Sequence, residues 1–275
     1  MKSSQMTRLL GVLTSFPKVI VAFSGGVDST LLLRLCTDAL GPDRVIAATG
    51  VSQTYTAEEK AQALEFAGAL GVKHVLLETD ELACTEFAAN PSDRCYFCKR
   101  ELYAKISQLA SREGGPVILD ATNASDLADY RPGRKAAEEY GVTSPFVLAG
   151  LTKSDIRAVA KELGLESWNK PANPCLASRV PYGTRITVEV LEKVHAGESF
   201  IRRLGFPVVR LRHHDRLARI EIPEEDFARF LRPATIRRVT ACLKSLGYSW
   251  IGLDIEGYRT GSLNEALPEL GTKSE

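Results

Sequence analysis

A buried strand that runs directly into two glycines constrains this chain more than any other feature. Residues 19–23 are all apolar, residues 24–26 read Ser-Gly-Gly, and leucines recur at helical spacing from Leu31 onward. The order strand, glycine turn, helix is the repeating unit of a parallel α/β sheet. Consecutive glycines such as Gly25 and Gly26 let backbone amides approach an anion, and the amino end of the next helix adds N–H donors. The segment therefore predicts an α/β fold and an anion-binding loop.

The side chains of this turn extend the prediction to a nucleotide. Ser24, Ser29 and Thr30 supply hydroxyl donors, and Asp28 is a candidate ligand for a Mg²⁺ ion that bridges phosphates. Two glycines alone often form only a tight turn between a strand and a helix. Here the string Ser-Gly-Gly-Val-Asp-Ser follows a buried strand, and no Gly-Lys-Ser or Gly-Lys-Thr comes after it. Transfer of a terminal phosphate is therefore not the expected reaction.

The rest of the chain continues the alternation of strands and helices. We predict strands at 45–48, 75–77 and 117–119, and helices at 56–70 and 152–164 that begin with capping boxes. The fold class is thus α/β, a doubly wound parallel sheet with helices on both faces, joined to a second, smaller α+β domain. In the smaller domain we predict helices at 188–204 and 233–246 and strands at 208–211, 218–222 and 250–253. The expected boundaries are 1–165 for the sheet domain, 166–186 for a functional loop or linker, 187–267 for the α+β domain and 268–275 for a disordered tail.

Composition narrows the classes of function. The chain has 275 residues, and its 35 Lys and Arg against 34 Asp and Glu argue against a protein that coats nucleic acid. It has neither an apolar run of about 18 residues nor a signal-peptide pattern, so we expect a cytoplasmic protein. In a reducing compartment its six cysteines should not form disulfides. Cys36 and Cys242 lie in apolar helical patterns and are expected to be small buried side chains.

The remaining clustered cysteines are candidates for metal binding or catalysis. Cys95 and Cys98 form a Cys-x-x-Cys pair at a predicted helix start, where thiol pKa values are depressed, and Cys175 lies in the proline-rich loop. A zinc site and two unrelated cysteines both remain alternatives for the pair. Zinc would need a fourth ligand, and none of the four histidines is obviously near in sequence.

A basic strand offers a second set of candidates. Arg210, Arg212 and His214 alternate on one face of the segment 209–215, with Leu211 on the other face. Such a face suits a phosphate and a carboxylate, because guanidinium groups bind both in bidentate geometry. The alternative is an exposed polar face on an edge strand.

The nucleotide loop resembles the PP-loop signature, Ser-Gly-Gly-x-Asp-Ser, of enzymes that split ATP into AMP and pyrophosphate. The resemblance implies an adenine nucleotide alpha-hydrolase-like sheet, with ATP and Mg²⁺ at the carboxyl edge of the strands. It also implies nucleotide contacts from Ala48, Thr49 and Gly50, which follow the second strand. Amide-forming ligases and sulfur transferases share this loop, so the loop alone does not choose between them.

Further segments resemble the LarE family of PP-loop sulfur transferases, over about residues 19–222. They are Asp93–Lys99 with its two cysteines, Asp120–Asn123, Asp126–Pro132 with Gly133 and Arg134, and Asn173–Arg179 with Cys175. The resemblance implies adenylation of pyridinium-3,5-biscarboxylic acid mononucleotide and conversion of its carboxylates to thiocarboxylates, for the synthesis of a nickel-pincer nucleotide cofactor.

The resemblance also implies roles for individual residues. In some family members the cysteine that matches Cys175 gives up its own sulfur and becomes dehydroalanine. In others it joins a Cys-x-x-Cys pair to hold a 4Fe-4S cluster, and this chain, with Cys95 and Cys98, resembles that type; the open iron would carry a hydrosulfide. Arg210 and Arg212 are implied in binding substrate phosphate. Weaker candidates for the substrate or a metal are Ser178, Arg179, Glu198 and Glu221.

The resemblance leaves several alternatives and partner predictions. Other PP-loop catalysts, a tRNA thiolase or an amide-forming ligase, are the alternative enzymes, although the near-neutral charge speaks against a tRNA substrate. A non-catalytic sensor of nucleotide and metal is the alternative outside enzymes. We expect a homo-oligomer that binds a small nucleotide substrate, neither nucleic acid nor membrane, and a downstream nickel-insertion enzyme as partner.

Overall fold

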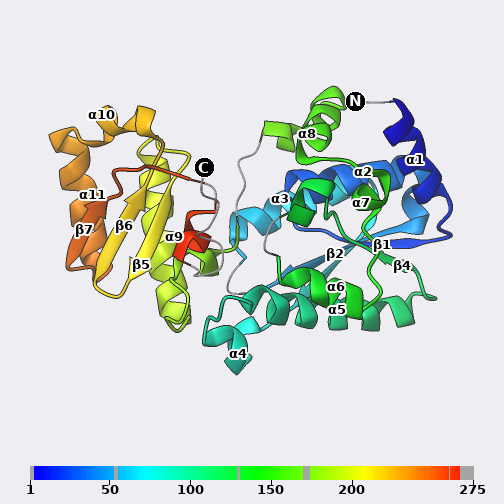
Figure 1. The fold of residues 1–275 in the computed structure, drawn as a ribbon, viewed down its shortest axis with the longest axis horizontal. Coiled ribbons are helices and arrows are strands. Elements are labelled where there is room, and N and C mark those ends of the chain that lie inside the picture. Colours follow the sequence, from blue (N-terminus) through cyan, green and yellow to red (C-terminus); the bar gives the residue numbers. More distant parts are fainter. Residues whose placement is uncertain (1–2, 53–54, 129–130, 170–173, 260, 267–275) are drawn as a thin grey trace. The chain divides into compact units, whose positions relative to one another are not determined.

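The chain folds into two units in the computed structural model (Figure 1). The structure describes residues 3–52, 55–128, 131–169, 174–259 and 261–266. The larger unit comprises Met1–Cys84 and Asp93–Asn173, and the smaller unit comprises Thr85–Ser92 and Pro174–Glu275. The predicted tail at 268–275 lies outside the described residues.

A four-stranded parallel sheet forms the centre of the larger unit. Its strands are β1 (Val19–Ala22), β2 (Val45–Val51), β3 (Lys73–Glu78) and β4 (Val117–Leu119), in the order β3-β2-β1-β4. In this order the chain moves outward from β1 through β2 to β3 and then returns to the other side of β1. The turns after β1 and β4 therefore flank a switch point, which is where open α/β sheets bind ligands.

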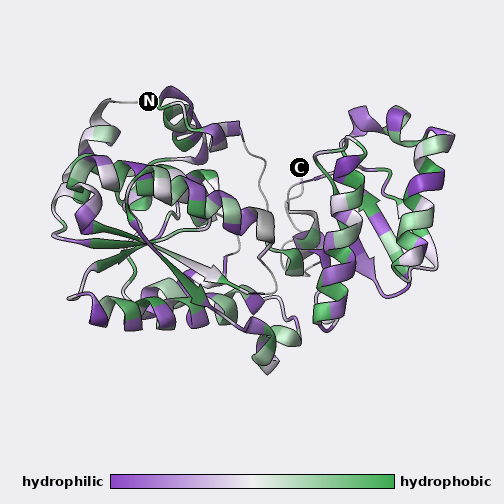
Figure 2. Cartoon of the chain, turned by 180° about the vertical axis from the view of Figure 1, so that it is seen from behind, coloured by the Kyte–Doolittle hydropathy of each residue, from purple (hydrophilic) through white to green (hydrophobic). Residues whose placement is uncertain are grey.

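Helices cover both faces of this sheet, as the sequence predicted (Figures 1 and 2). Val19 and Val21 face a core shared with one helical layer, and Ile20 and Ile46 face a core shared with the other. The first layer holds α1 (Ser3–Thr14), α2 (Val27–Leu40), α3 (Ala57–Ala69), α7 (Pro145–Ala149) and α8 (Lys153–Glu162). The second layer holds α5 (Arg94–Arg112) and α6 (Gly133–Glu139). Short 3-10 helices complete the larger unit: η1 (Pro42–Arg44), η2 (Glu81–Ala83), η3 (Ala124–Ala128) and η4 (Glu166–Asn169).

Both predicted capping boxes are confirmed. At the start of α3, Thr56 Oγ1 accepts a hydrogen bond from the backbone nitrogen of Glu59, and the backbone nitrogen of Thr56 donates to the Glu59 carboxylate in return. Thr152 and Asp155 make the same pair of bonds at the start of α8. Each box satisfies backbone donors that a helix start otherwise leaves open. In the described part of the chain, no helix is both long enough and apolar enough to span a membrane.

The smaller unit is a three-stranded mixed sheet with helices on one face. Strands β5 (Arg210–His214) and β6 (Leu217–Glu221) pair antiparallel, and β7 (Trp250–Leu253) pairs parallel to β6. Helices α9 (Val188–Arg203), α10 (Phe227–Phe230) and α11 (Pro233–Ser245) share one apolar core with this sheet. Gly197 lets α9 approach β5 closely, because a Cβ there would lie 2.6 Å from Leu211 Cδ2. The remaining short helices of this unit are α4 (Thr85–Ala88), η5 (Leu176–Arg179), η6 (Glu224–Asp226) and η7 (Ser262–Ala266).

An eight-residue segment from early in the chain belongs to the smaller unit. Within Thr85–Ser92, the buried Asn90 adopts a left-handed conformation, with φ of 58°. Its amide nitrogen donates to the carbonyls of Pro181 at 2.7 Å and Thr184 at 3.0 Å. The backbone of Gly183 in turn donates to the carbonyl of Asn90 at 2.9 Å. The segment therefore completes the fold of the loop that follows Cys175.

The predicted linker at 166–186 contains η4 and η5. Residues 170–173 of this stretch lie outside the described residues, as do 129 and 130 of the run Asp126–Pro132. Contacts divide the chain between Asn173 and Pro174, so residues 174–186 of the predicted linker belong to the smaller unit.

Candidate functional site

The nucleotide loop forms at the carboxyl end of β1. Gly25 has φ of +73°, a conformation that favours glycine, and Gly26 caps α2. The hydroxyl oxygens of Ser24 and Ser29 lie 3.1 Å apart, and the backbone nitrogen of Ser24 donates to Ser29 Oγ at 3.2 Å. Thr30 is buried behind them in the first turn of α2. The loop therefore gathers glycine amides and two hydroxyls at a helix amino terminus, as an anion site requires.

Lys153 is the partner of Asp28. The ammonium of Lys153, in the first turn of α8, forms an ion pair with Asp28 Oδ2. Asp28 Oδ1 is buried and has no hydrogen-bond partner within the described residues. An oxygen in this state fits a cation, so the carboxylate suits the Mg²⁺ that the sequence implied. Sequence reasoning missed Lys153, whose only local signal is that it follows the capping residue Thr152.

Ala48, Thr49 and Gly50, which were predicted to follow the second strand and contact the nucleotide, lie within β2, because the strand extends to Val51, and they are packed there. Thr49 Oγ1 donates to the carbonyl of Phe23 at 2.6 Å and lies 2.8 Å from His74 Nε2. A Cβ at Gly50 would lie 2.9 Å from Leu102 Cδ1, and Ala48 is buried. These residues join the ends of β1, β2 and β3. Their contact with a nucleotide stays a prediction.

Tyr55 lies against the nucleotide loop and was also missed. Its hydroxyl donates to the carbonyl of Ser24 at 3.3 Å. A Cβ at Gly25 would lie 3.9 Å from the hydroxyl oxygen of Tyr55. Burial, and then the charge of Glu59, raise the pKa of Tyr55 to about 12. The hydroxyl therefore remains a hydrogen-bond donor at neutral pH.

A charged pair lies at the carboxyl end of β4. Asp120 accepts hydrogen bonds from Ser144 Oγ at 2.6 Å, Thr122 Oγ1 at 2.7 Å and Tyr103 Oη at 3.2 Å. Tyr103 and, more weakly, Asp120 raise the pKa of Lys99 against the opposing effect of burial. A protonated lysine thus stands beside the second turn at the switch point.

The predicted cysteine pair lies in the first turn of α5. Cys95 is exposed, whereas Cys98 is partly buried and donates to Glu81 Oε1 at 3.6 Å. Glu81 is 6% exposed, and its second oxygen has no hydrogen-bond partner in the described residues. Cys175 is exposed and belongs to the smaller unit. Across the described ranges, no three His, Cys, Asp or Glu side chains form a group that could hold a metal ion.

A buried arginine holds the loop that carries Cys175. Arg179 is 1% exposed and donates to the carbonyls of Pro174 and Cys175 and to Ser178 Oγ. It also forms an ion pair with Glu198 at 2.8 Å, and Arg202 pairs with the same carboxylate. Burial opposes ionisation of Glu198, yet Arg179 and Arg202 keep the pKa of its carboxyl below the ordinary value.

Arg212 is the centre of a second network. It binds both oxygens of the fully buried Glu221, at 2.8 and 2.7 Å. It also donates to the carbonyl of Ser178 at 2.8 Å, so Ser178 joins the two networks. Arg219 pairs with Glu221 at 3.1 Å and with Asp254. Glu198 and Glu221, which were candidates for a metal or substrate role, therefore pair with arginines of the chain itself.

Arg210 adds positive charge beside the first network. It is 5% exposed, and the ring centroid of Tyr258 lies 5.2 Å from its guanidinium. Burial, and then the charge of Arg179, lower its pKa to about 10. Among the described residues, the two networks contain five arginines, Arg179, Arg202, Arg210, Arg212 and Arg219, and three carboxylates, Glu198, Glu221 and Asp254.

The alternative reading of β5 as a solvent-exposed polar face is wrong for Arg210 and Arg212, which are both buried. Their charge is retained inside the unit because carboxylates come from α9 and β6, which a single strand cannot reveal. His214, predicted on the same face, is exposed at the end of β5.

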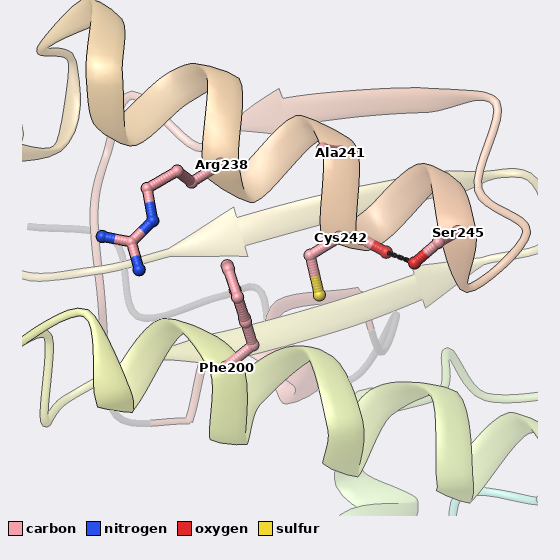
Figure 3. A pocket seen from close by; sticks show the side chains of 5 residues that line it. All are labelled: Phe200, Arg238, Ala241, Cys242 and Ser245. Atoms are coloured by element: carbon pink, nitrogen blue, oxygen red, sulfur yellow. Dashed lines mark hydrogen bonds between the residues drawn. The ribbon is translucent and has the colours of Figure 1, made fainter.

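The two cysteines predicted to be buried behave differently. Cys36 is fully buried, and burial raises the pKa of its thiol to about 12, so the prediction is confirmed. Cys242 is partly exposed, which corrects the prediction for it. It lines an open surface pocket of about 470 Å³ between α9 and α11 (Figure 3), together with Phe200, Arg238, Ala241 and Ser245.

Several known proteins are similar to this chain. A family described as NAD synthase matches residues 12–106. Pyridinium-3,5-bisthiocarboxylic acid mononucleotide synthase of Lactiplantibacillus plantarum is 39% identical over 265 residues, 96% of this chain and 95% of that protein. An uncharacterized protein of Synechocystis is 40% identical over 97% of this chain and 99% of its own length. The tRNA-specific 2-thiouridylase of Azorhizobium caulinodans is 28% identical over 66% of this chain and 56% of that protein.

Proposed function

Because the chain belongs to the LarE family of PP-loop proteins, we propose that it is an ATP-dependent sulfurtransferase that acts on pyridinium-3,5-biscarboxylic acid mononucleotide. It adenylates the carboxylates of this substrate and converts them to thiocarboxylates, as a step in the synthesis of a nickel-pincer nucleotide. The observation that carries the proposal is the 39% identity, over nearly the whole length of both chains, to a synthase whose name states the bisthiocarboxylic acid product.

The nucleotide loop supports cleavage of ATP between its α and β phosphates. The substrate carboxylate attacks the α phosphorus, the α–β bridging bond breaks, and pyrophosphate leaves with the electron pair of that bond. Loop amides and the hydroxyls of Ser24 and Ser29 stabilise the departing charge. Asp28 would bind the Mg²⁺ that accompanies the phosphates, through the oxygen that has no partner within the described residues, and the Lys153 ammonium would bind the phosphate oxygens.

Adenylation solves a problem of reactivity. A free carboxylate is a poor electrophile, whereas the acyl-adenylate has AMP as a leaving group. A sulfur nucleophile adds to the acyl carbon, AMP departs, and the thiocarboxylate remains. ATP supplies the free energy and the protein supplies position and charge stabilisation.

The arginine networks of the smaller unit support binding of the substrate phosphate. Arginines outnumber carboxylates among the described residues of these networks, which suits the negative charge of a phosphate monoester. Arg179, Arg210 and Arg212 are buried, so an anion beside them meets little screening by solvent. Ser178 and Arg179 lie beside Cys175, which brings the anion site and this cysteine into one loop region.

We further propose that Cys95, Cys98 and Cys175 hold a 4Fe-4S cluster. Thiolates are the ligands that such clusters require, and two observations support the proposal: Cys95 and Cys175 are exposed, and Cys98 follows Cys95 by three residues in one helix. With three protein ligands, the cluster would supply one iron that is open to an exogenous sulfide. Arg179 holds the backbone at Cys175 in place for this role.

Three further predictions belong to the proposal. The protein forms a homo-oligomer, it is cytoplasmic, and a nickel-insertion enzyme uses its product. The test of the function is product analysis. Anaerobically purified protein, the biscarboxylic mononucleotide, Mg-ATP and sulfide should yield AMP, pyrophosphate and a product that is heavier because sulfur replaces oxygen. Formation of ADP and phosphate, or modification of tRNA in place of the mononucleotide, would contradict it.

A further inference from the structure

The segment that follows β7 lies on the arginine networks of the smaller unit. Residues 254–259 and 261–266, which we name the C-terminal strap, contact these networks. Asp254 pairs with Arg219, the Tyr258 ring lies over Arg210, and Ser262 bonds to Arg212. On the basis of the proposed function, we propose that Tyr258 and Ser262 are positioning residues that orient Arg210 and Arg212 toward the substrate phosphate.

A glycine turn sets the position of Tyr258. Gly257 has φ of +69°, and a Cβ there would lie 3.1 Å from the carbonyl oxygen of Ile222. The backbone nitrogen of Tyr258 donates to that same carbonyl at 2.9 Å. This bond attaches the strap just beyond the end of β6. The ring is therefore held over the guanidinium of Arg210, at 5.2 Å, by the backbone and not by chance contact.

Ser262 contacts both members of the pair between Arg212 and Glu221. Its hydroxyl accepts a hydrogen bond from Arg212 Nη2 at 2.7 Å and donates toward Glu221 Oε1 at 3.4 Å. Ser262 is 9% exposed, so the contact is shielded from solvent. A hydroxyl that both accepts and donates fixes the rotation of the guanidinium about its long axis.

The strap is also fastened to the loop that follows Cys175. Tyr182 donates from its hydroxyl to Asn264 Oδ1 at 2.9 Å. Within the strap, Arg259 and Glu265 form an ion pair at 2.9 Å. A segment with these attachments orders both arginines before any ligand arrives. Preorganised charge lowers the cost of binding an anion, and this is the advantage we assign to the strap.

Paired substitutions test the positioning role. Tyr258→Leu removes the aromatic face and Tyr258→Phe keeps it; Ser262→Ala removes the hydroxyl and Ser262→Thr keeps it. We expect Tyr258→Leu and Ser262→Ala to raise KM for the mononucleotide about five- to thirtyfold, the range for one cation–π contact or hydrogen bond, with KM for ATP unchanged. The conservative variants should recover most of the affinity. Ile255→Ala, at a residue that is 85% exposed in the same strap, is the matched control and should change neither KM.

Direct titration of the mononucleotide into each folded variant, without ATP, completes the experiment. Unchanged substrate affinity in both Tyr258→Leu and Ser262→Ala, or an equal loss of affinity for ATP, overturns the positioning role. If one variant does not fold by circular dichroism, the other decides. Wild-type protein that neither binds the mononucleotide nor forms AMP contradicts the proposed function itself, which is a separate outcome.

Discussion

Lys153 and Asp28 are 125 residues apart in the sequence and form an ion pair at the nucleotide loop. The pair joins the starts of α2 and α8, and it places a flexible cation where phosphates are expected. A lysine in this position can leave the carboxylate when Mg²⁺ arrives and turn to a phosphate oxygen. Before the nucleotide binds, each of the two side chains therefore neutralises the charge of the other.

We predict that Lys153→Ala lowers ATP affinity roughly ten- to a hundredfold, since a charge-assisted contact contributes about 1.5–3 kcal/mol. Asp28→Asn should abolish most pyrophosphate formation while the fold is kept. Isothermal titration with ATP and a pyrophosphate assay measure the two effects. Lys161→Ala, at the other end of α8, is the matched control. Full activity of Asp28→Asn would contradict the proposal that Asp28 binds Mg²⁺.

We predict that Arg212→Ala destabilises the protein by about 3–5 kcal/mol, because it leaves the buried Glu221 without its bidentate partner. Urea unfolding measures the loss. Arg34→Ala breaks an exposed pair with Asp38 and should have little effect. Mononucleotide affinity should also fall in Arg212→Ala, and in Arg210→Ala, with ATP affinity kept. If Arg212→Ala were as stable as wild type, the pair of Arg212 with Glu221 would not contribute to the stability of the fold.

We predict that anaerobic protein is brown and contains about four irons per chain, as a 4Fe-4S cluster requires. Cys95→Ala, Cys98→Ala and Cys175→Ala should each lose iron and repeated turnover, whereas the partly exposed Cys242→Ala should keep both. Iron analysis and product counts measure this. Colourless protein that acts once and loses roughly 34 Da, as Cys175 becomes dehydroalanine, would support the sacrificial reaction instead.

We predict a specific acid sensitivity from Glu198. Its folded pKa lies below the ordinary value of 4.5, so its ionised form stabilises the fold. That contribution is complete above the unfolded pKa and is lost as the pH falls through the folded pKa. The difference in unfolding free energy between wild type and Glu198→Gln should therefore be constant near neutral pH and shrink below about 4.5. A difference independent of pH would contradict the assignment.

Much of the larger unit was predictable because its signals are local. The strands at β1 and β4 follow from apolar runs, and α3 and α8 follow from capping boxes whose partners are three residues apart. The nucleotide loop is equally local. By contrast, Lys153 and Tyr55 reach the loop through tertiary folding, and no spacing rule connects them to it.

The arginines of β5 were only partly predictable from the sequence. Alternation along the strand predicted that Arg210 and Arg212 share a face, and the register with β6 agrees. Their burial was not predictable, because the carboxylates that make it tolerable come from distant elements. Residues of the C-terminal strap carried no motif at all.

The inserted segment Thr85–Ser92 gives the chain three peptide crossings between its units, at 84–85, 92–93 and 173–174. No single cut can release the smaller unit whole. A fragment that starts at Pro174 would lack Asn90, and the carbonyls of Pro181 and Thr184 would lose their donor. Recombination that exchanges the C-terminal half between relatives therefore mixes two parents inside one unit, so such chimaeras should be joined with residues 85–92 taken from the same parent as the C-terminal half.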